Sequence, residues 1–177
     1  MKYLLLMILI GAFQKFSIAQ SDAELIRSDL VKNWRLAKEL TSEYLQKMPA
    51  EKYAFKPHDS VRSFAEQMLN LAQVTSAMVS HGTGIPRLFE KGKLLEIREG
   101  SRTKDSVIHY VTLSYDYVIR SIIEMDTKKF AEKVTERNME ESRLNWILKA
   151  FDHQTHHRGQ TTIYLRLAGI KPPVWRE

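Results

Sequence analysis

Hydrophobic residues recur at steps of three and four along four long stretches of the chain, which is the spacing that gathers them on one face of an α-helix. The first stretch covers residues 21–48 and contains neither glycine nor proline before Pro49. Ser21 or Asp22 is suited to cap its start. The pattern predicts one amphipathic helix that ends at the proline, with an apolar face formed by Leu30, Trp34, Ala37, Leu40 and Tyr44.

The same spacing predicts three further helices, which cover about residues 61–80, 104–125 and 139–169. Turn-forming sequences separate them: HGTGIP, a segment containing Gly92 and Gly100, and the final KPP. The segment KKFAEKVTER alternates weakly and is expected to be a short extended excursion. Four helices predict an all-α fold, a four-helix bundle. The second and third connections are longer than a tight turn, so an up-down-up-down order does not follow.

The N-terminal sequence MKYLLLMILIGAFQKFSIAQ combines a lysine, an apolar run and small residues at positions 17 and 19, the layout of a secretory signal peptide. We expect residues 1–19 to be the signal peptide, cleaved between Ala19 and Gln20, and residues 20–177 to form one domain. The apolar run is short for a membrane span, so we expect an exported protein, periplasmic or secreted, with no stable membrane span after cleavage. The alternatives are an uncleaved anchor or a buried N-terminal helix.

The chain of 177 residues has no cysteine, which excludes disulfides, thiolate nucleophiles and cysteine-based zinc sites. The formal net charge is +6, and removal of residues 1–19 lowers it to +4 because two lysines and no acid are lost. The remaining basic residues are interspersed with acids, as in ERNMEESR, so a solvated surface is favoured and no nucleic-acid partner is expected. No dinucleotide fingerprint or P-loop is present, and no nucleotide cofactor is expected.

Three of the six histidines fall within HQTHH, residues 153–157. At about 100° per residue, His153 and His157 lie on the core face of the last helix, whereas His156 lies on its flank. Their i, i+4 spacing places two imidazoles on adjacent turns, where both can reach one metal ion. The alternative is a pair of buried imidazoles that are hydrogen-bonded to hydroxyl or backbone groups.

A third metal ligand would have to come from another helix. One face of the second helix carries Glu66, Asn70 and His81, with Gln73 at its edge. His81 lies about 16 Å along the helix from Asn70, so one ion cannot use both. Two further histidines lack a comparable partner and are expected on the surface: His58 and His109.

Three residues that follow the histidine pair in the sequence also have expected roles. Arg158 and Gln160 are expected either to support the pair or to serve as a surface arginine and a glutamine that hydrogen-bonds between helices. Gly159 is costly inside a helix, so we expect it to permit the close approach of a neighbouring helix.

The stretch HQTHHRGQTTIYLRLAGIKPP resembles the C-terminal signature of the DinB-like (DinB/YfiT) family, small four-helix-bundle proteins that are predicted metalloenzymes. The resemblance extends to RSFAEQMLNLAQ in the second helix, to the preceding FKP and to the aromatic-containing first helix. It covers most of the chain after the signal peptide. It implies a four-helix bundle of the DinB/YfiT type.

The resemblance also implies a divalent metal, zinc or nickel, held by three histidines. The family's i, i+4 pair maps onto His153 and His157, and its second-helix histidine maps onto Asn70. An amide oxygen is a harder and weaker ligand for these metals than an imidazole nitrogen. Three hypotheses follow: Asn70 is a weak third ligand, Glu66 or Gln73 completes the site, or the bundle has lost its metal and is a binding or structural module.

Some members of the family are thiol-dependent transferases, in which the metal activates the thiolate of a low-molecular-weight thiol. The resemblance therefore implies a metal-activated thiol or water, and a transferase or hydrolase reaction on a small-molecule substrate. Asp116 and Glu66 are the candidate proton acceptors. Bundles of this size often pair through helix faces, so a homodimer is a further expectation.

Overall fold

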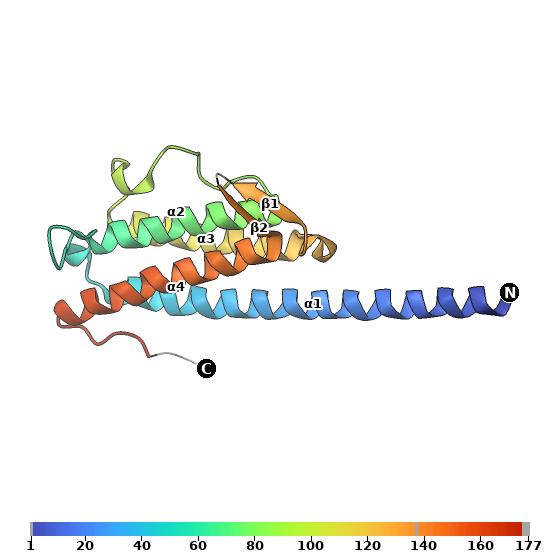
Figure 1. Cartoon of the computed structure of the whole chain (residues 1–177). Helices are drawn as coiled ribbons and strands as arrows, with labels where there is room; N and C mark the ends of the chain where they lie inside the picture. The colour runs from blue at the N-terminus through green and yellow to red at the C-terminus, as the bar shows by residue number, and fades with distance from the viewer. Residues whose placement is uncertain (1, 137, 175–177) are drawn as a thin grey trace.

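The computed structural model describes the backbone of residues 2–136 and 138–174, and the side chains of residues 22–136 and 138–174. Most of the chain is helical (Figure 1), in the elements α1 (Lys2–Lys47), α2 (Phe64–Thr83), α3 (Lys104–Glu124) and α4 (Arg143–Leu167). The shorter elements are the 3₁₀ turns η1 (Ala50–Lys52), η2 (Leu95–Ile97) and η3 (Thr127–Lys129), and the strands β1 (Lys133–Glu136) and β2 (Met139–Ser142).

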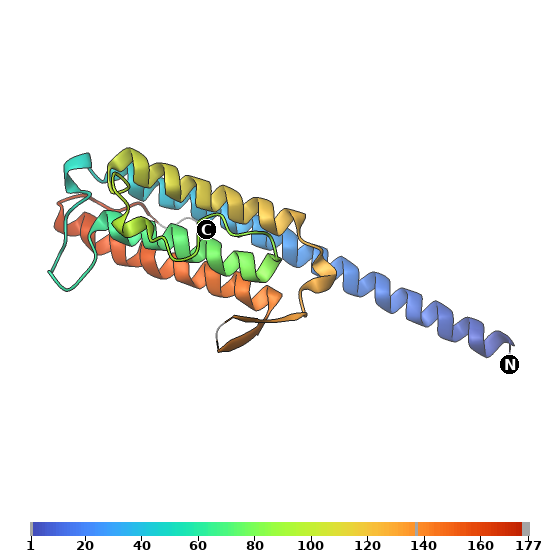
Figure 2. The ribbon, with the colours of Figure 1, turned by 90° about the horizontal axis from the view of Figure 1, so that it is seen from above.

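The four helices form a bundle in which α1 packs against α3 and α4, and α2 packs against the same two helices. Helices α1 and α4 run in one direction, and α2 and α3 run in the other (Figures 1 and 2). The order is therefore up-down-down-up. The connection of residues 84–103 permits this order because it returns along the outside of α2 before α3 begins. As a result, α4 lies antiparallel to α2 and in extensive contact with it.

The predicted apolar face of the first helix is confirmed, because all five of its residues are buried. Trp34 lies at the centre of this face, and its ring is edge-on to two others. The ring centroids lie 5.9 Å apart for Tyr115 of α3 and 5.1 Å apart for Phe151 of α4. Such edge-to-face pairs contribute about 0.5–1.5 kcal/mol each beyond the burial of the rings. One tryptophan on α1 thus ties together the two helices that flank it.

Helix α2 has a defined start and a defined end. The Ser63 side chain accepts from the backbone N–H of Glu66, and the Glu66 carboxylate accepts from the backbone N–H of Ser63, which together form a capping box. The helix ends at Gly84, whose φ of 78° is the left-handed conformation that glycine adopts without a steric penalty. The helix runs three residues beyond the predicted end at Ser80 because Gly82 is helical rather than a terminator.

The close approach of helices occurs at Gly82 and not at Gly159. A Cβ atom on Gly82 would lie 2.8 Å from the carbonyl oxygen of Arg143 and 2.9 Å from Cγ1 of Ile147, both on α4. A Cβ atom on Gly159 would meet no described atom within 4 Å. The expectation for Gly159 was therefore wrong, because this residue lies on the exposed side of α4.

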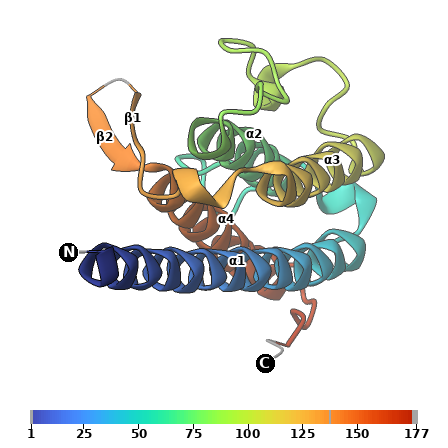
Figure 3. The ribbon, with the colours of Figure 1, turned by 90° about the vertical axis from the view of Figure 1, so that its right-hand side faces the viewer.

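Strands β1 and β2 form an antiparallel hairpin before α4, paired from Lys133↔Ser142 to Glu136↔Met139. The extended excursion is confirmed, but the fold is mostly helical rather than all-α. Residues 139–142 were also wrongly assigned to the last helix. That helix begins at Arg143, because the Ser142 side chain accepts from the backbone N–H of Asn145 at 3.1 Å and caps it there. Figure 3 shows the hairpin and the α2–α3 connection as separate projections from the bundle.

Helix α1 is continuous through Ser21 and Asp22, so neither residue caps it as expected. Its first part extends beyond the bundle (Figure 1). The side chains of residues 1–21, which include the predicted signal peptide, lie outside the described residues. Within the part that is described, no helix is both long and apolar enough to cross a membrane.

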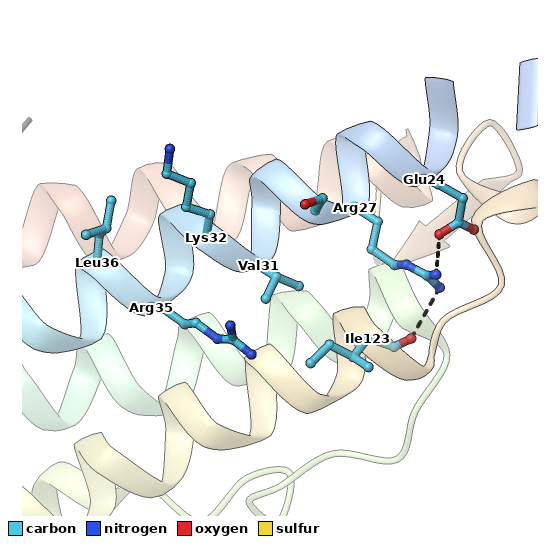
Figure 4. Close-up of a pocket in the computed structure, with 8 residues that line it drawn as sticks. Glu24, Arg27, Val31, Lys32, Arg35, Leu36 and Ile123 are labelled. Atoms are coloured by element: carbon cyan, nitrogen blue, oxygen red, sulfur yellow. Dashed lines mark hydrogen bonds and ion pairs between the residues drawn. The ribbon is translucent and has the colours of Figure 1, made fainter. Parts of the chain in front are cut away.

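Figure 4 shows the place where α1 leaves the bundle, beside a cleft of about 490 Å³. The Arg27 guanidinium donates to the carbonyl oxygens of Ile123 and Met125, each at 3.3 Å, and pairs with Glu24. Glu24 in turn accepts from the Thr127 hydroxyl at 2.8 Å. These contacts fasten α1 to the C-terminal end of α3.

Candidate metal centre

His153 and His157 lie one turn apart on α4, on the side that packs against α2. Their ring centroids are 4.5 Å apart. His157 is buried and His153 is half-buried, whereas His156 between them is exposed. The prediction that the pair shares the core face, with His156 on the flank, is confirmed.

Both imidazoles contact α2 through the same ring nitrogen. Nδ1 of His157 lies 2.7 Å from Oε1 of Gln67, and Nδ1 of His153 lies 3.2 Å from Oγ1 of Thr75. Among the described residues, Nε2 of neither ring has a hydrogen-bond partner. A histidine that ligates a metal through one nitrogen usually hydrogen-bonds through the other. In both rings Nδ1 makes the hydrogen bond, so Nε2 is the nitrogen that could ligate a metal.

The surroundings keep both imidazoles uncharged at neutral pH. Burial lowers the pKa of His153 to about 4, and the neighbouring His157, His156 and Arg62 act in the same direction. Burial likewise lowers the pKa of His157 to about 4, with His156 and Arg62 adding to the effect and Glu96 opposing it. Because a metal binds the neutral imidazole, both rings are in the ligating form at pH 7.

Asn70 lies on α2 and is half-buried. Its side-chain Nδ2 donates to Oε1 of Glu96, a residue of η2 in the α2–α3 connection. The other carboxylate oxygen of Glu96 accepts from Nε of Arg62 at 2.7 Å. The charge of Glu96 also acts to raise the pKa of His157, against the effect of burial. Sequence reasoning missed it because the irregular segment 87–102 has no periodicity that would orient a side chain.

The two alternative third ligands have structural roles of their own. The Glu66 carboxylate belongs to the capping box and also accepts from Arg102 at 3.2 Å. Burial opposes the change, but the hydrogen bonds from Ser63 and the charge of Lys56 lower the pKa of Glu66. Gln73 holds the α2–α3 connection, since its Nε2 donates to the Lys93 carbonyl and its Oε1 accepts from the Leu95 N–H, both at 2.8 Å.

Asp116 lies elsewhere in the bundle. It is exposed on α3, where it pairs with Lys38 of α1 and lines a groove between those two helices. The histidine pair instead lies between α4 and α2. A role for Asp116 as proton acceptor at the histidines therefore has no geometric support.

The three histidines outside residues 153–157 are separate from the pair, as expected. His81 lies near the end of α2, where its ring is 5.2 Å from that of Trp146 and its Nε2 is 2.9 Å from Arg87. The two that were predicted on the surface are exposed: His58 and His109.

The donor set fits a divalent metal in part. Two neutral imidazoles with hydrogen-bonded Nδ1 atoms suit zinc or nickel. In the described part of the chain, however, no three histidine, cysteine, aspartate or glutamate side chains converge on one point. Asn70 lies between Gln67 and Thr75 in the sequence of α2, and its side-chain nitrogen donates to Glu96. The chain thus offers two strong ligands, and water or a bound molecule would have to complete the coordination.

The protein is thus a mostly helical four-helix bundle that holds an i, i+4 histidine pair between its second and last helices. The chain belongs to the DinB family, whose model matches residues 20–176. No curated protein matches it.

Two crystal structures share the fold. A DinB-like protein from Bacillus cereus ATCC 10987 has 16% sequence identity and a TM-score of 0.69, with 83% of this chain and 95% of that chain covered. A DinB-like protein from Bacillus subtilis has 14% identity and a TM-score of 0.67, with 84% and 99% covered. At such identities the likeness establishes the fold alone.

Proposed function

We propose that this DinB-family protein binds a divalent metal, zinc or nickel, through His153 and His157. The observation that carries the proposal is the arrangement of the two rings, each neutral and each bound to α2 through Nδ1 with Nε2 left available. Asn70 would be a weak third ligand through its amide oxygen, because its nitrogen is already a donor to Glu96. A ligand set of this kind holds metal less tightly than three histidines do.

The reaction class that this site supports is transfer or hydrolysis on a small molecule. When bound, the metal would act as a Lewis acid that lowers the pKa of a coordinated thiol or water. The protein contributes orientation, since Gln67 and Thr75 hold the two imidazoles. We assign the role of proton acceptor to Glu96, because its carboxylate accepts from Asn70 and acts on the pKa of His157. Asp116 instead lies in a groove between α1 and α3, and Glu66 belongs to the capping box.

We also propose that the protein acts after export. The support is the sequence layout of residues 1–19, with a lysine, an apolar run and small residues before Gln20. A periplasmic or secreted protein meets little of the cytosolic thiol pool, and nucleic acid is not an expected partner.

A second candidate function is supported by Asn70. Its amide is used as a hydrogen-bond donor to Glu96, which is a structural use and not a ligating one. On this reading the histidines are hydrogen-bonded core residues, and the bundle is a metal-free binding module. The two candidates differ in one measurable quantity, the amount of metal bound.

The test is a titration of untagged protein with zinc and with nickel, followed by calorimetry. We expect the parent to bind one equivalent, and His153→Ala and His157→Ala each to abolish measurable binding. His156→Ala is the matched control, because His156 is on the same helix but exposed, and it should leave the affinity unchanged. If both core variants bound metal as the parent does, or if the parent bound none, the metal-free module would be the better description.

A further inference from the structure

We propose that Gln67 and Tyr164 are positioning residues that fix His157 in a single tautomer, with the proton on Nδ1 and the lone pair on Nε2. The inference rests on the proposed function only for its consequence, which is that Nε2 is the atom offered to a metal. The tautomer itself follows from a chain of hydrogen bonds that links three side chains to the backbone of Arg62.

The chain of hydrogen bonds begins at the phenol of Tyr164. Its hydroxyl donates to the backbone carbonyl oxygen of Arg62 at 2.6 Å, and a phenol has only one proton to give. Toward any other neighbour the Tyr164 oxygen can act only as an acceptor. Tyr164 is 4% exposed, so water does not compete readily for this position.

The orientation of Gln67 follows from that of Tyr164. Its side-chain Nε2 lies 3.4 Å from the Tyr164 oxygen and donates to it. An amide has donors on one side and an acceptor on the other, so Oε1 must face the opposite way. That oxygen lies 2.7 Å from Nδ1 of His157.

The proton on His157 is then determined. An amide oxygen can only accept, so Nδ1 of the imidazole must be the donor. The neutral ring carries one proton, which leaves the lone pair on Nε2. The reverse orientation of Gln67 would turn its oxygen toward the Tyr164 oxygen, whose only proton is committed to Arg62. Two acceptors would then face each other in a buried site, where unmatched polar groups are costly.

The contact of His153 provides a contrast. Its Nδ1 faces the Thr75 hydroxyl, which can donate or accept by rotating. That contact selects neither tautomer. The lock is therefore specific to His157, the more buried of the two rings.

Arg62 connects this lock to the neighbouring carboxylate. Its backbone carbonyl oxygen accepts a hydrogen bond from the Tyr164 hydroxyl, and its guanidinium donates to Glu96 at 2.7 Å. Glu96 is in turn the acceptor for Asn70. Arg62, which precedes α2, thus hydrogen-bonds both to Tyr164 of the tautomer lock and to the Glu96 carboxylate.

The experiment is a long-range proton–nitrogen NMR correlation on metal-free protein labelled with ¹⁵N in histidine, at pH 7. We expect His157 in the parent to show a protonated Nδ1 and an unprotonated Nε2. In Tyr164→Phe, which keeps the ring and removes the hydroxyl, and in Gln67→Met, which removes the acceptor, the two tautomers should both be populated. Gln67→Glu should restore the single Nδ1–H form, because one carboxylate oxygen accepts from Nδ1 and the Tyr164 hydroxyl can turn from Arg62 to donate to the other.

Tyr44→Phe is the matched control. The Tyr44 hydroxyl lies 2.9 Å from the hydroxyl of Thr162 on α4, and Thr162 is not part of the lock. Its removal should leave the His157 spectrum unchanged. An Nε2–H form in the parent, or a single Nδ1–H form that persists in both Tyr164→Phe and Gln67→Met, would overturn the inference.

Zinc titration of the same proteins separates this inference from the proposed function. Gln67→Met should weaken zinc binding about 10–100-fold, and Gln67→Glu should rescue it. A parent that has the Nδ1–H form but binds no zinc would refute the metal function and uphold the lock. Zinc binding that is unaffected by Gln67→Met would overturn the positioning role.

Discussion

At the scale of single residues, the identity of a side chain and the direction of its hydrogen bonds decide what the centre can bind. His153 and His157 are suited to a metal because their Nδ1 atoms are occupied and their Nε2 atoms are available. Asn70 is less suited, because its amide oxygen is a weaker ligand for zinc or nickel than an imidazole nitrogen. The three positions thus differ in ligand strength by chemistry alone.

The residue-scale prediction concerns Asn70→His. An imidazole at this position would replace a weak amide ligand with a nitrogen donor and complete a three-histidine set. We expect the zinc affinity to rise at least about tenfold, measured by competition with a chelating dye. Asn33→His is the control, because it adds a histidine to an exposed position on α1, away from the pair. An equal rise in both variants, or no rise in either, would contradict a preserved site.

At the scale of elements, two glycines in helices have opposite roles. Gly82 lies where α2 and α4 approach so closely that a methyl group would contact backbone. Gly159 lies on the exposed side of α4, where a methyl group would meet no described atom. From sequence both residues are simply glycines in helical patterns, and only the position of the partner helix distinguishes them.

The element-scale prediction compares alanine at the two positions. Gly159→Ala should raise the free energy of unfolding by about 0.5–1 kcal/mol, because glycine is the poorer helix former and the site has room. Gly82→Ala should lower it by about 1–3 kcal/mol through overpacking against α4. Urea denaturation followed by circular dichroism measures both. A loss of stability in Gly159→Ala, together with a change in molecular mass by light scattering, would instead indicate that this face pairs with a second copy.

At the scale of the whole molecule, the order of the helices creates the centre. The long α2–α3 connection lets α3 run parallel to α2. Helix α4 then packs against α2 as its second neighbour. His153 and His157 therefore face Thr75 and Gln67. The same connection carries Glu96 back to Asn70.

The prediction at this scale concerns the N-terminus. Expression with the native leader should yield a protein that begins at Gln20, as read by intact-mass spectrometry of the exported fraction. A protein produced directly from Gln20 should unfold at the same midpoint as the full chain, because the described contacts of α1 with the bundle begin near Glu24 and Arg27. An intact leader in the exported protein, or a lower midpoint without it, would favour the anchor or the buried helix.

The sequence by itself determined the helical class, the buried face of the first helix and the pairing of His153 with His157, because these depend on local periodicity. It did not determine the buried face of α2, because the face that carries Glu66, Asn70 and His81 is only half-buried. It also indicated the family, through the stretch around HHRGQ. Periodicity did not predict strand β2, whose residues pair with β1 and whose last residue, Ser142, caps α4.

Only the tertiary structure decided which side chains meet the histidines. Gln67 and Thr75 lie far from α4 in sequence, and their contacts with the histidines depend on the packing of α2 against α4. The contact of Glu96 with Asn70 depends on the path of an irregular connection. Hydrogen-bond direction is likewise a property of the assembled network, since the proton of His157 depends on Tyr164 and on the carbonyl of Arg62. Spacing along one helix can place two imidazoles together, but it cannot orient the groups that another helix brings to them.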